Sequence, residues 1–266
     1  MNYVHGYSAR ESARLTDQAT TLTELLHSDT VYPTGSTILE AGCGVGAQTV
    51  ILSRNSPGAH FTSIDISPTS LEAAAALISR ENIKNVTFQH ADIFELPFPA
   101  EHFDHIFVCF VLEHLADPIA ALRALLPVLK RSGTITVIEG DHGSTYFHPE
   151  SPLASQAVQC LIDIQAQLGG NSLIGRQLYP LLKNAGFADV SVSPRMVYVD
   201  SSKQGLLKGF TRNTFIAMVE GVRQEALSRK LMTADQWDKG IADLYASAGE
   251  DGVFCYTFFK GTAVRQ

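Results

Sequence analysis

Apolar residues between residues 8 and 140 alternate between helical spacing and short continuous runs. The helical spacings predict helices at 8–27, 47–54, 69–80 and 117–130. The short runs predict strands at 37–40, 60–65, 86–90, 103–110 and 134–139. Strands separated by helices are typical of right-handed βαβ units. We therefore expect an α/β fold with a doubly wound parallel sheet covered by helices on both faces.

The pattern changes after residue 140. A loop at 140–152 precedes a helix at about 153–168, and a second helix stops at Gly186, a typical C-terminal glycine. A sixth strand is expected at 189–199 and a last strand at about 253–264. Residues 203–252 between them read as mostly helical, so we expect a helical lid inserted between the last two strands.

Composition narrows the function classes. The 266 residues include 20 Lys and Arg against 27 Asp and Glu, a formal net charge of −7. Such a chain lacks the basic field that binding to a phosphate backbone requires, so we expect no nucleic-acid partner. The four cysteines are scattered and form no C-x-x-C pair, which argues against a zinc ribbon and against a disulfide framework.

No segment of the chain predicts a membrane span. The longest continuous apolar run, 106–112, is far shorter than the ~20 residues that cross a bilayer, and the first residues lack the apolar core of a signal peptide. We expect a soluble, cytoplasmic protein.

The first candidate chemistry lies in a glycine-rich loop between a strand and a helix. The segment reads Glu-Ala-Gly-Cys-Gly-Val-Gly over residues 40–46. Glycines allow a tight turn and let backbone N–H groups approach a ligand at the positive end of the following helix. Because Gly42, Gly44 and Ala47 also satisfy the dinucleotide fingerprint G-x-G-x-x-A, the loop alone does not separate NAD from other adenosine cofactors.

Three acidic residues at strand ends separate these cofactors better. Glu40 ends the first strand, Asp65 ends the second, and Asp92 follows the third. A carboxylate after the second strand can accept hydrogen bonds from a ribose diol, and one after the third can reach the amine of an adenine. This layout favours an adenosine cofactor without a diphosphate, although each carboxylate can also be an ordinary strand-end or turn-capping residue.

The chain resembles the class I S-adenosylmethionine-dependent methyltransferases, most closely the small-molecule branch of the ubiquinone/menaquinone-biosynthesis type. The resemblance covers about 37–140 and rests on the glycine loop, SIDIS, HADIFELPF, FDHIFVCFVLEHLADP and LKRSGTITVIEG. It implies a Rossmann-like, mostly parallel seven-stranded sheet whose last two strands form an antiparallel hairpin. Arg-Ser-Gly at 131–133 departs from the usual Pro-Gly-Gly, a change of little consequence.

The resemblance also implies which residues hold S-adenosylmethionine. The glycine loop would cradle the methionine portion, Asp65 would bind the ribose, and Asp92 with the backbone of Ile93 would hold the adenine. The full set of implied cofactor-binding residues is Glu40, Gly42, Cys43, Gly44, Gly46, Asp65, Ile66, Asp92, Ile93, Cys109 and Leu112.

The same resemblance divides the chain into parts of one domain. Residues 1–30 would form a cap helix, and 31–140 the cofactor-binding core. Residues 141–266, including the insertion at 203–252, would carry the parts that recognise the methyl acceptor.

The acceptor side offers several candidates. His142 follows the fifth strand and is the best candidate base, unless its ring only caps the loop or binds Asp141. Tyr7 precedes the first helix and could close over the cofactor. Tyr146, His148 and Arg176 could contact the acceptor, although Arg176 can equally be a solvated helix residue. No pair of histidines has metal spacing, so we expect no metal.

These observations predict a methyltransferase that acts on a small-molecule acceptor by in-line displacement. Two alternatives stay open: an NAD-type oxidoreductase that uses the same glycine loop, and a regulatory protein that binds the cofactor without catalysis. The sequence names neither the acceptor atom nor the oligomeric state.

Overall fold

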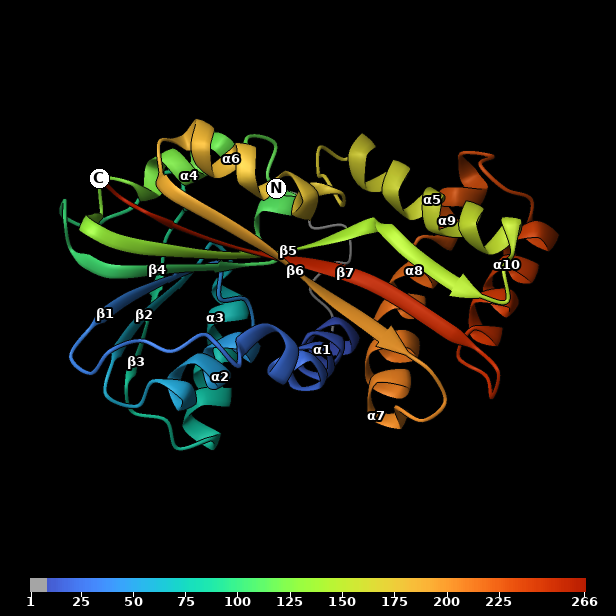
Figure 1. The fold of residues 1–266 in the computed structure, drawn as a ribbon, viewed down its shortest axis with the longest axis horizontal. Coiled ribbons are helices and arrows are strands. Elements are labelled where there is room, and N and C mark those ends of the chain that lie inside the picture. Colours follow the sequence, from blue (N-terminus) through green and yellow to red (C-terminus); the bar gives the residue numbers. More distant parts are fainter. Residues whose placement is uncertain (1–8) are drawn as a thin grey trace. The chain divides into compact units, whose positions relative to one another are not determined.

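The computed structural model describes residues 9–266, with side chains from Gln18 onward. Its strands form one seven-stranded sheet in the order β3-β2-β1-β4-β5-β7-β6 (Figure 1). The expected α/β class and mostly parallel sheet with antiparallel C-terminal strands are confirmed. The strands are β1 (Thr37–Ala41), β2 (His60–Asp65), β3 (Val86–His90), β4 (Phe103–Cys109), β5 (Leu129–His148), β6 (Ala188–Val199) and β7 (Val253–Val264).

The helices include the predicted ones and several in the insertion. They are α1 (Ala9–His27), α2 (Ala47–Asn55), α3 (Pro68–Arg80), η1 (Leu112–His114), α4 (Pro118–Leu125), α5 (Pro152–Gln167), η2 (Ile174–Gln177), α6 (Leu178–Ala185), α7 (Gln204–Leu206), the π-helix η3 (Leu207–Ile216), α8 (Ala217–Gly221), α9 (Arg223–Ser228) and α10 (Ala234–Ala246). No helix in the described part of the chain is both long and apolar enough to cross a membrane.

The chain divides into two compact units, which we describe separately. The first, the sheet unit, comprises Thr23–Glu139, Ile174–Pro194 and Phe259–Gln266. The second, the insertion unit, comprises Gly140–Leu173 and Arg195–Phe258 together with the described residues 9–22.

In the sheet unit, β1 pairs in parallel with β2 on one side and with β4 on the other. Helices α2 and α3 lie on one face of these strands, and α4 and α6 lie on the opposite face (Figure 1). The winding direction therefore reverses between β1 and β4. Ligands of such sheets bind outside the carboxyl ends of the strands at this switch point.

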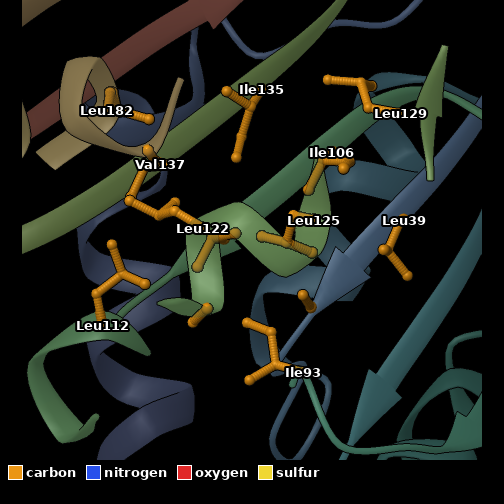
Figure 2. Close-up of a cluster of buried hydrophobic side chains, with 14 of the residues drawn as sticks. Leu39, Ile93, Ile106, Leu112, Leu122, Leu125, Leu129, Ile135, Val137 and Leu182 are labelled. Atoms are coloured by element: carbon orange, nitrogen blue, oxygen red, sulfur yellow. The ribbon is translucent and has the colours of Figure 1, made fainter. Parts of the chain in front are cut away.

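The face of the sheet under α4 and α6 carries the main apolar cluster. Figure 2 shows Leu39 and Ile106 from the central strands, with Leu122 and Leu125 of α4 and Leu182 of α6, and all five are fully buried. At about 25 cal/mol per Å² of apolar surface removed from water, such contacts supply most of the stabilising energy of the unit. They fix β1 and β4 against α4 and α6.

Local capping groups begin three of the helices. The hydroxyl of Ser67 accepts a hydrogen bond from the backbone N–H of Ser70, and the carboxylate of Asp117 accepts one from that of Ala120. A proline follows each of these two caps at the first helical position, where its missing N–H costs nothing. Helix α10 begins with a capping box at Thr233.

Two expected boundaries around β5 were wrong. The helix expected to reach Lys130 ends at Leu125, and β5 runs from Leu129 to His148 rather than over 134–139. Pro127 cannot continue a helix, and Leu129 instead pairs with Phe103 of β4. Long-range pairing therefore decides the length of this strand.

The insertion unit has its own packed core. Helix α10 packs against α5, where a side chain added at Gly240 would lie 2.6 Å from the carbonyl oxygen of Leu153. The ring of Tyr256 contacts those of Phe210 and Phe215, each at a centroid distance of 5.5 Å, and all three residues are buried. Residues 203–252 are thus mainly helical, as predicted, and many of their apolar side chains pack within the unit.

Candidate functional site

The glycine loop folds around three left-handed backbone positions in the sheet unit. Gly42, Gly44 and Gly46 have φ angles of 81°, 52° and 80°. A Cβ atom at Gly42 would lie 2.4 Å from Cγ2 of Val111, whereas one at Gly44 would meet nothing within 4 Å. Gly42 is therefore required by packing inside the protein, while Gly44 borders open space.

Asp65 connects this loop to the end of β2. Its Oδ2 accepts a hydrogen bond of 2.8 Å from the backbone N–H of Gly44, and its Oδ1 accepts one of 2.9 Å from that of Ser67. The adjacent Ile66 side chain is 47% exposed, which is unusual for a large apolar residue. The carboxyl ends of β1 and β2 thus present a half-buried carboxylate next to an exposed apolar side chain.

Glu40 lies beneath the loop and is almost fully buried. Its Oε2 accepts hydrogen bonds from the hydroxyl groups of Ser63, at 2.6 Å, and Thr49, at 2.7 Å. Burial raises the pKa of Glu40 to about 7, although the two hydroxyl groups oppose the shift. This carboxyl ties β1, β2 and α2 together under the glycine loop.

Helix α2 begins at Gly46 without a side-chain cap. The first N–H groups of an α-helix have no partner within the helix and attract anions. The start of α2 can therefore bind a carboxylate or phosphate group placed in the loop.

Asp92 makes a tight turn after β3. Its Oδ1 accepts a hydrogen bond of 2.9 Å from the backbone N–H of Phe94, so the turn-capping role considered from the sequence is present. The side chain of Ile93 is buried in the main apolar cluster (Figure 2). The backbone of this turn and the half-buried Asp92 lie after β3, the strand that pairs with β2.

Cys109 and Leu112 flank the turn that follows β4. Both are buried, and Leu112 packs in the main apolar cluster (Figure 2). Burial raises the pKa of the Cys109 thiol well above its usual range, with the charge of Glu139 as the next cause. Cys43 in the glycine loop is also buried, and burial raises its thiol pKa in the same way. Neither cysteine is thus a thiolate nucleophile at neutral pH.

His142 belongs to the insertion unit and is 5% exposed. Its Nδ1 lies 2.8 Å from the hydroxyl oxygen of Tyr256, and its ring contacts that of Phe215. A Cβ atom at Gly140 would lie 2.3 Å from the same hydroxyl oxygen. Gly140 therefore makes room for the pairing of His142 with Tyr256.

The remaining acceptor-side candidates belong to different units. Tyr146 is 56% exposed on β5, and its hydroxyl group donates to Sδ of Met196 at 3.6 Å. His148 is exposed at the end of the same strand. Arg176 is exposed on η2 and belongs to the sheet unit, whereas the other two belong to the insertion unit. Tyr7 lies outside the described residues.

Metal-binding clusters are absent from the described residues: no group of three or more His, Cys, Asp or Glu side chains could hold a metal ion.

Two buried residues next to the candidates described above, Glu139 and Tyr256, were not named as candidates from the sequence. Glu139 is fully buried within β5, at the residue where the apolar pattern ends the expected strand 134–139, so the strand pattern could have indicated it, as it did for Glu40. Tyr256 has no local signal, because it lies 114 residues from His142 and only the fold brings the two together.

The glycine loop and its strands match a known family. Residues 39–137 match the family model described as a methyltransferase domain. The expected resemblance to methyltransferases is therefore confirmed for this part of the chain.

Individual relatives are also similar in sequence to the chain. An uncharacterized 37.1 kDa protein in a transposon of Streptomyces fradiae is 32% identical over 70% of this chain and 54% of its own length. A demethylmenaquinone methyltransferase of Listeria monocytogenes is 28% identical over 40% of this chain and 45% of its own length. The chain thus spans about half the length of the curated relatives it matches.

A solved structure shares the fold. Phosphoethanolamine N-methyltransferase 2 of Haemonchus contortus, determined in complex with S-adenosyl-L-methionine, aligns with a TM-score of 0.54 and 17% identity. The alignment covers 94% of this chain and 52% of that one.

Proposed function

Because residues 39–137 match the family model of a methyltransferase domain, we propose that the protein transfers a methyl group from S-adenosylmethionine to a small-molecule acceptor. The observation that carries this proposal is the arrangement at the switch point: a glycine loop with open space at Gly44, whose backbone is bonded to the carboxylate of Asp65. The relatives that are named as methyltransferases support it.

The residues at this edge of the sheet fit the cofactor. The uncapped start of α2 suits the carboxylate of the methionine portion. Asp65 can still accept hydrogen bonds from ribose hydroxyl groups, because a carboxylate accepts about four hydrogen bonds and the carboxylate of Asp65 accepts two from the backbone. The exposed Ile66 offers an apolar surface for the adenine, with Asp92 and the backbone of Ile93 at its edge. Cys109 and Leu112 would line the place of methyl transfer through the backbone after β4.

When bound, S-adenosylmethionine supplies a methyl carbon activated by the positive sulfonium sulfur. The protein then has mainly to align donor and acceptor for in-line displacement, which can lower the barrier by several kcal/mol. We propose that His142, oriented by Tyr256, takes the proton from an acceptor that carries one, and that Tyr7 closes over the cofactor. Tyr146, His148 and Arg176 are proposed contacts to the acceptor.

Thermal unfolding with two ligands tests the cofactor. A ligand that binds only the folded protein raises its stability by RT ln(1 + [L]/Kd). We expect S-adenosylhomocysteine to raise the midpoint temperature and NAD to leave it unchanged. A rise with NAD alone would mean that the loop serves a dinucleotide.

Asp65→Ala tests the ribose contact. It is expected to weaken S-adenosylhomocysteine binding by up to a few kcal/mol, as for charge-assisted hydrogen bonds. Asp117→Asn is the matched control, because it removes one carboxylate from the same unit and leaves an equally good helix cap. Equal affinity of Asp65→Ala and the control would refute the role of Asp65.

A screen with radiolabelled methyl donor tests the acceptor class. We expect transfer to small, partly apolar metabolites. Labelling of proteins or nucleic acids alone would contradict the proposal. Tight cofactor binding without turnover on any acceptor would instead favour a regulatory protein.

A further inference from the structure

Glu139 is a buried carboxyl group that the proposed reaction does not use. It is the last residue of β5 in the sheet unit and has 0% exposure. Strands β4 and β5 pair in parallel up to Cys109 and Ile138, so the Glu139 side chain emerges where β4 ends. It therefore lies beside the turn that leads from β4 into η1.

That turn has a strained backbone. Phe110 has a φ angle of 57°, a left-handed conformation that costs a non-glycine residue roughly 1–2 kcal/mol. Its N–H donates to the carbonyl oxygen of Ile138 at 2.9 Å. Strained residues persist only where their surroundings determine the conformation, and they cluster at functional sites.

Glu139 supplies a further restraint on this turn. Its Oε1 accepts hydrogen bonds from the backbone N–H groups of Val111, at 3.0 Å, and Leu112, at 2.7 Å. Two neighbouring N–H groups are thus bound by one oxygen atom, which fixes the direction of the chain immediately after Phe110. The Leu112 side chain then enters the main apolar cluster (Figure 2).

The fixed turn in turn supports the glycine loop. With the turn in this position, Cγ2 of Val111 lies 2.4 Å from the place of a Cβ atom on Gly42. The N–H of Gly42 donates to the carbonyl oxygen of Ile64 at 2.8 Å, which holds the same residue to the neighbouring strand β2. Val111 and Ile64 thus both restrain the start of the loop at Gly42.

The second carboxyl oxygen of Glu139, Oε2, is buried without a stabilising hydrogen bond from any described residue. Among the described residues Oε2 has no hydrogen-bond partner and is inaccessible to solvent. Burial raises the pKa of this carboxyl well above its usual range, with the charge of Glu113 adding to the shift. A buried oxygen without a partner destabilises the fold, so the residue is better explained by the turn that it holds than by stability.

We propose that Glu139 is a positioning residue of the cofactor site, which sets the place of the glycine loop through the turn Phe110–Leu112 and the side chain of Val111. The inference rests on the proposed function, because it takes the ligand of this loop to be S-adenosylmethionine. Its probe is S-adenosylhomocysteine, titrated calorimetrically into the whole protein at a temperature where each variant is folded.

Two substitutions at Glu139 separate positioning from mere stability. Glu139→Ala removes both acceptor bonds and is expected to weaken binding at least tenfold. Glu139→Gln keeps a carbonyl oxygen for the same two N–H groups and is expected to bind within about threefold of the wild type. The control is Asp104→Asn, at the amino end of β4, whose carboxylate accepts from the Thr37 N–H and the Lys130 ammonium group. It is expected to lower stability and leave affinity unchanged.

The outcomes are distinct. If the wild type does not bind S-adenosylhomocysteine, the proposed function fails and this inference fails with it. If the wild type binds and Glu139→Ala binds equally well, the inference is overturned and the proposed function is not. The inference is also overturned if Glu139→Gln loses as much affinity as Glu139→Ala. If Glu139→Ala does not fold, Val111→Ala provides the test, because it removes the side chain next to Gly42 and keeps the backbone hydrogen bonds to Glu139. Unchanged affinity in this variant overturns the inference.

Discussion

Replacing Gly42 with alanine is expected to destabilise the protein far more than the same change at Gly44. Both residues have left-handed φ angles, 81° and 52°, so each variant meets the roughly 1–2 kcal/mol penalty of a side chain in this conformation. Only the Cβ at residue 42 overlaps a neighbour, Cγ2 of Val111 at 2.4 Å.

Overpacking of this kind typically costs a further 1–3 kcal/mol. We therefore expect Gly42→Ala to lower the free energy of unfolding by about 2–5 kcal/mol, and Gly44→Ala by about 1–2 kcal/mol. Urea denaturation without ligand measures both values, and linear extrapolation gives each free energy.

A double-mutant cycle identifies the cause. If the overlap with Val111 is responsible, Val111→Ala in the Gly42→Ala background should recover about 1–3 kcal/mol, whereas in the Gly44→Ala background it should recover none. Equal destabilisation by the two glycine substitutions would refute the reasoning, as would additivity of Gly42→Ala with Val111→Ala.

Three further predictions concern buried polar groups. Glu40 has a pKa of about 7 in the folded protein against an ordinary 4.5, so between these pH values only the unfolded state is ionised. Wild-type stability should therefore fall by about 3 kcal/mol more than that of Glu40→Gln as the pH rises from about 4.5 to about 7, and parallel pH profiles of the two proteins in urea would contradict this. Lys260 is 4% exposed and donates to the Leu26 carbonyl oxygen at the end of α1. Lys260→Met should therefore lower the free energy of unfolding by roughly 2–4 kcal/mol, and a urea midpoint equal to that of the wild type would rule this out. Tyr256→Phe removes the hydroxyl group that lies 2.8 Å from Nδ1 of the buried His142, so it should lower the free energy of unfolding by about 1–2 kcal/mol. Equal stability of the two proteins in urea would contradict this.

The sequence by itself determined the elements that depend on neighbouring residues. The helix starts at Ser67, Asp117 and Thr233 follow from capping groups within three residues of each start. The order of strands and helices up to residue 140 follows from periodicity, and with it the α/β class and the edge of the sheet that carries the glycine loop. Such signals are local in the chain and need no knowledge of the fold.

The candidate site was predictable only in part. Glu40, Asp65 and the glycine loop are recognisable because their roles are fixed by position relative to a strand end. That Glu40 bonds to Ser63 and Thr49, and that Asp65 bonds to the N–H of Gly44, required the packing of β1 against β2 and α2.

Tertiary structure alone decided the contacts between distant segments. Pairing with neighbouring strands extends β5 to His148, beyond the end that its apolar pattern predicts. Tyr256 reaches His142 across 114 residues, and Glu139 reaches Val111 across 28. A polar group in the interior takes whichever partner the fold places within hydrogen-bond distance, because leaving it unpaired is costly, and no local pattern of residues records which partner that is.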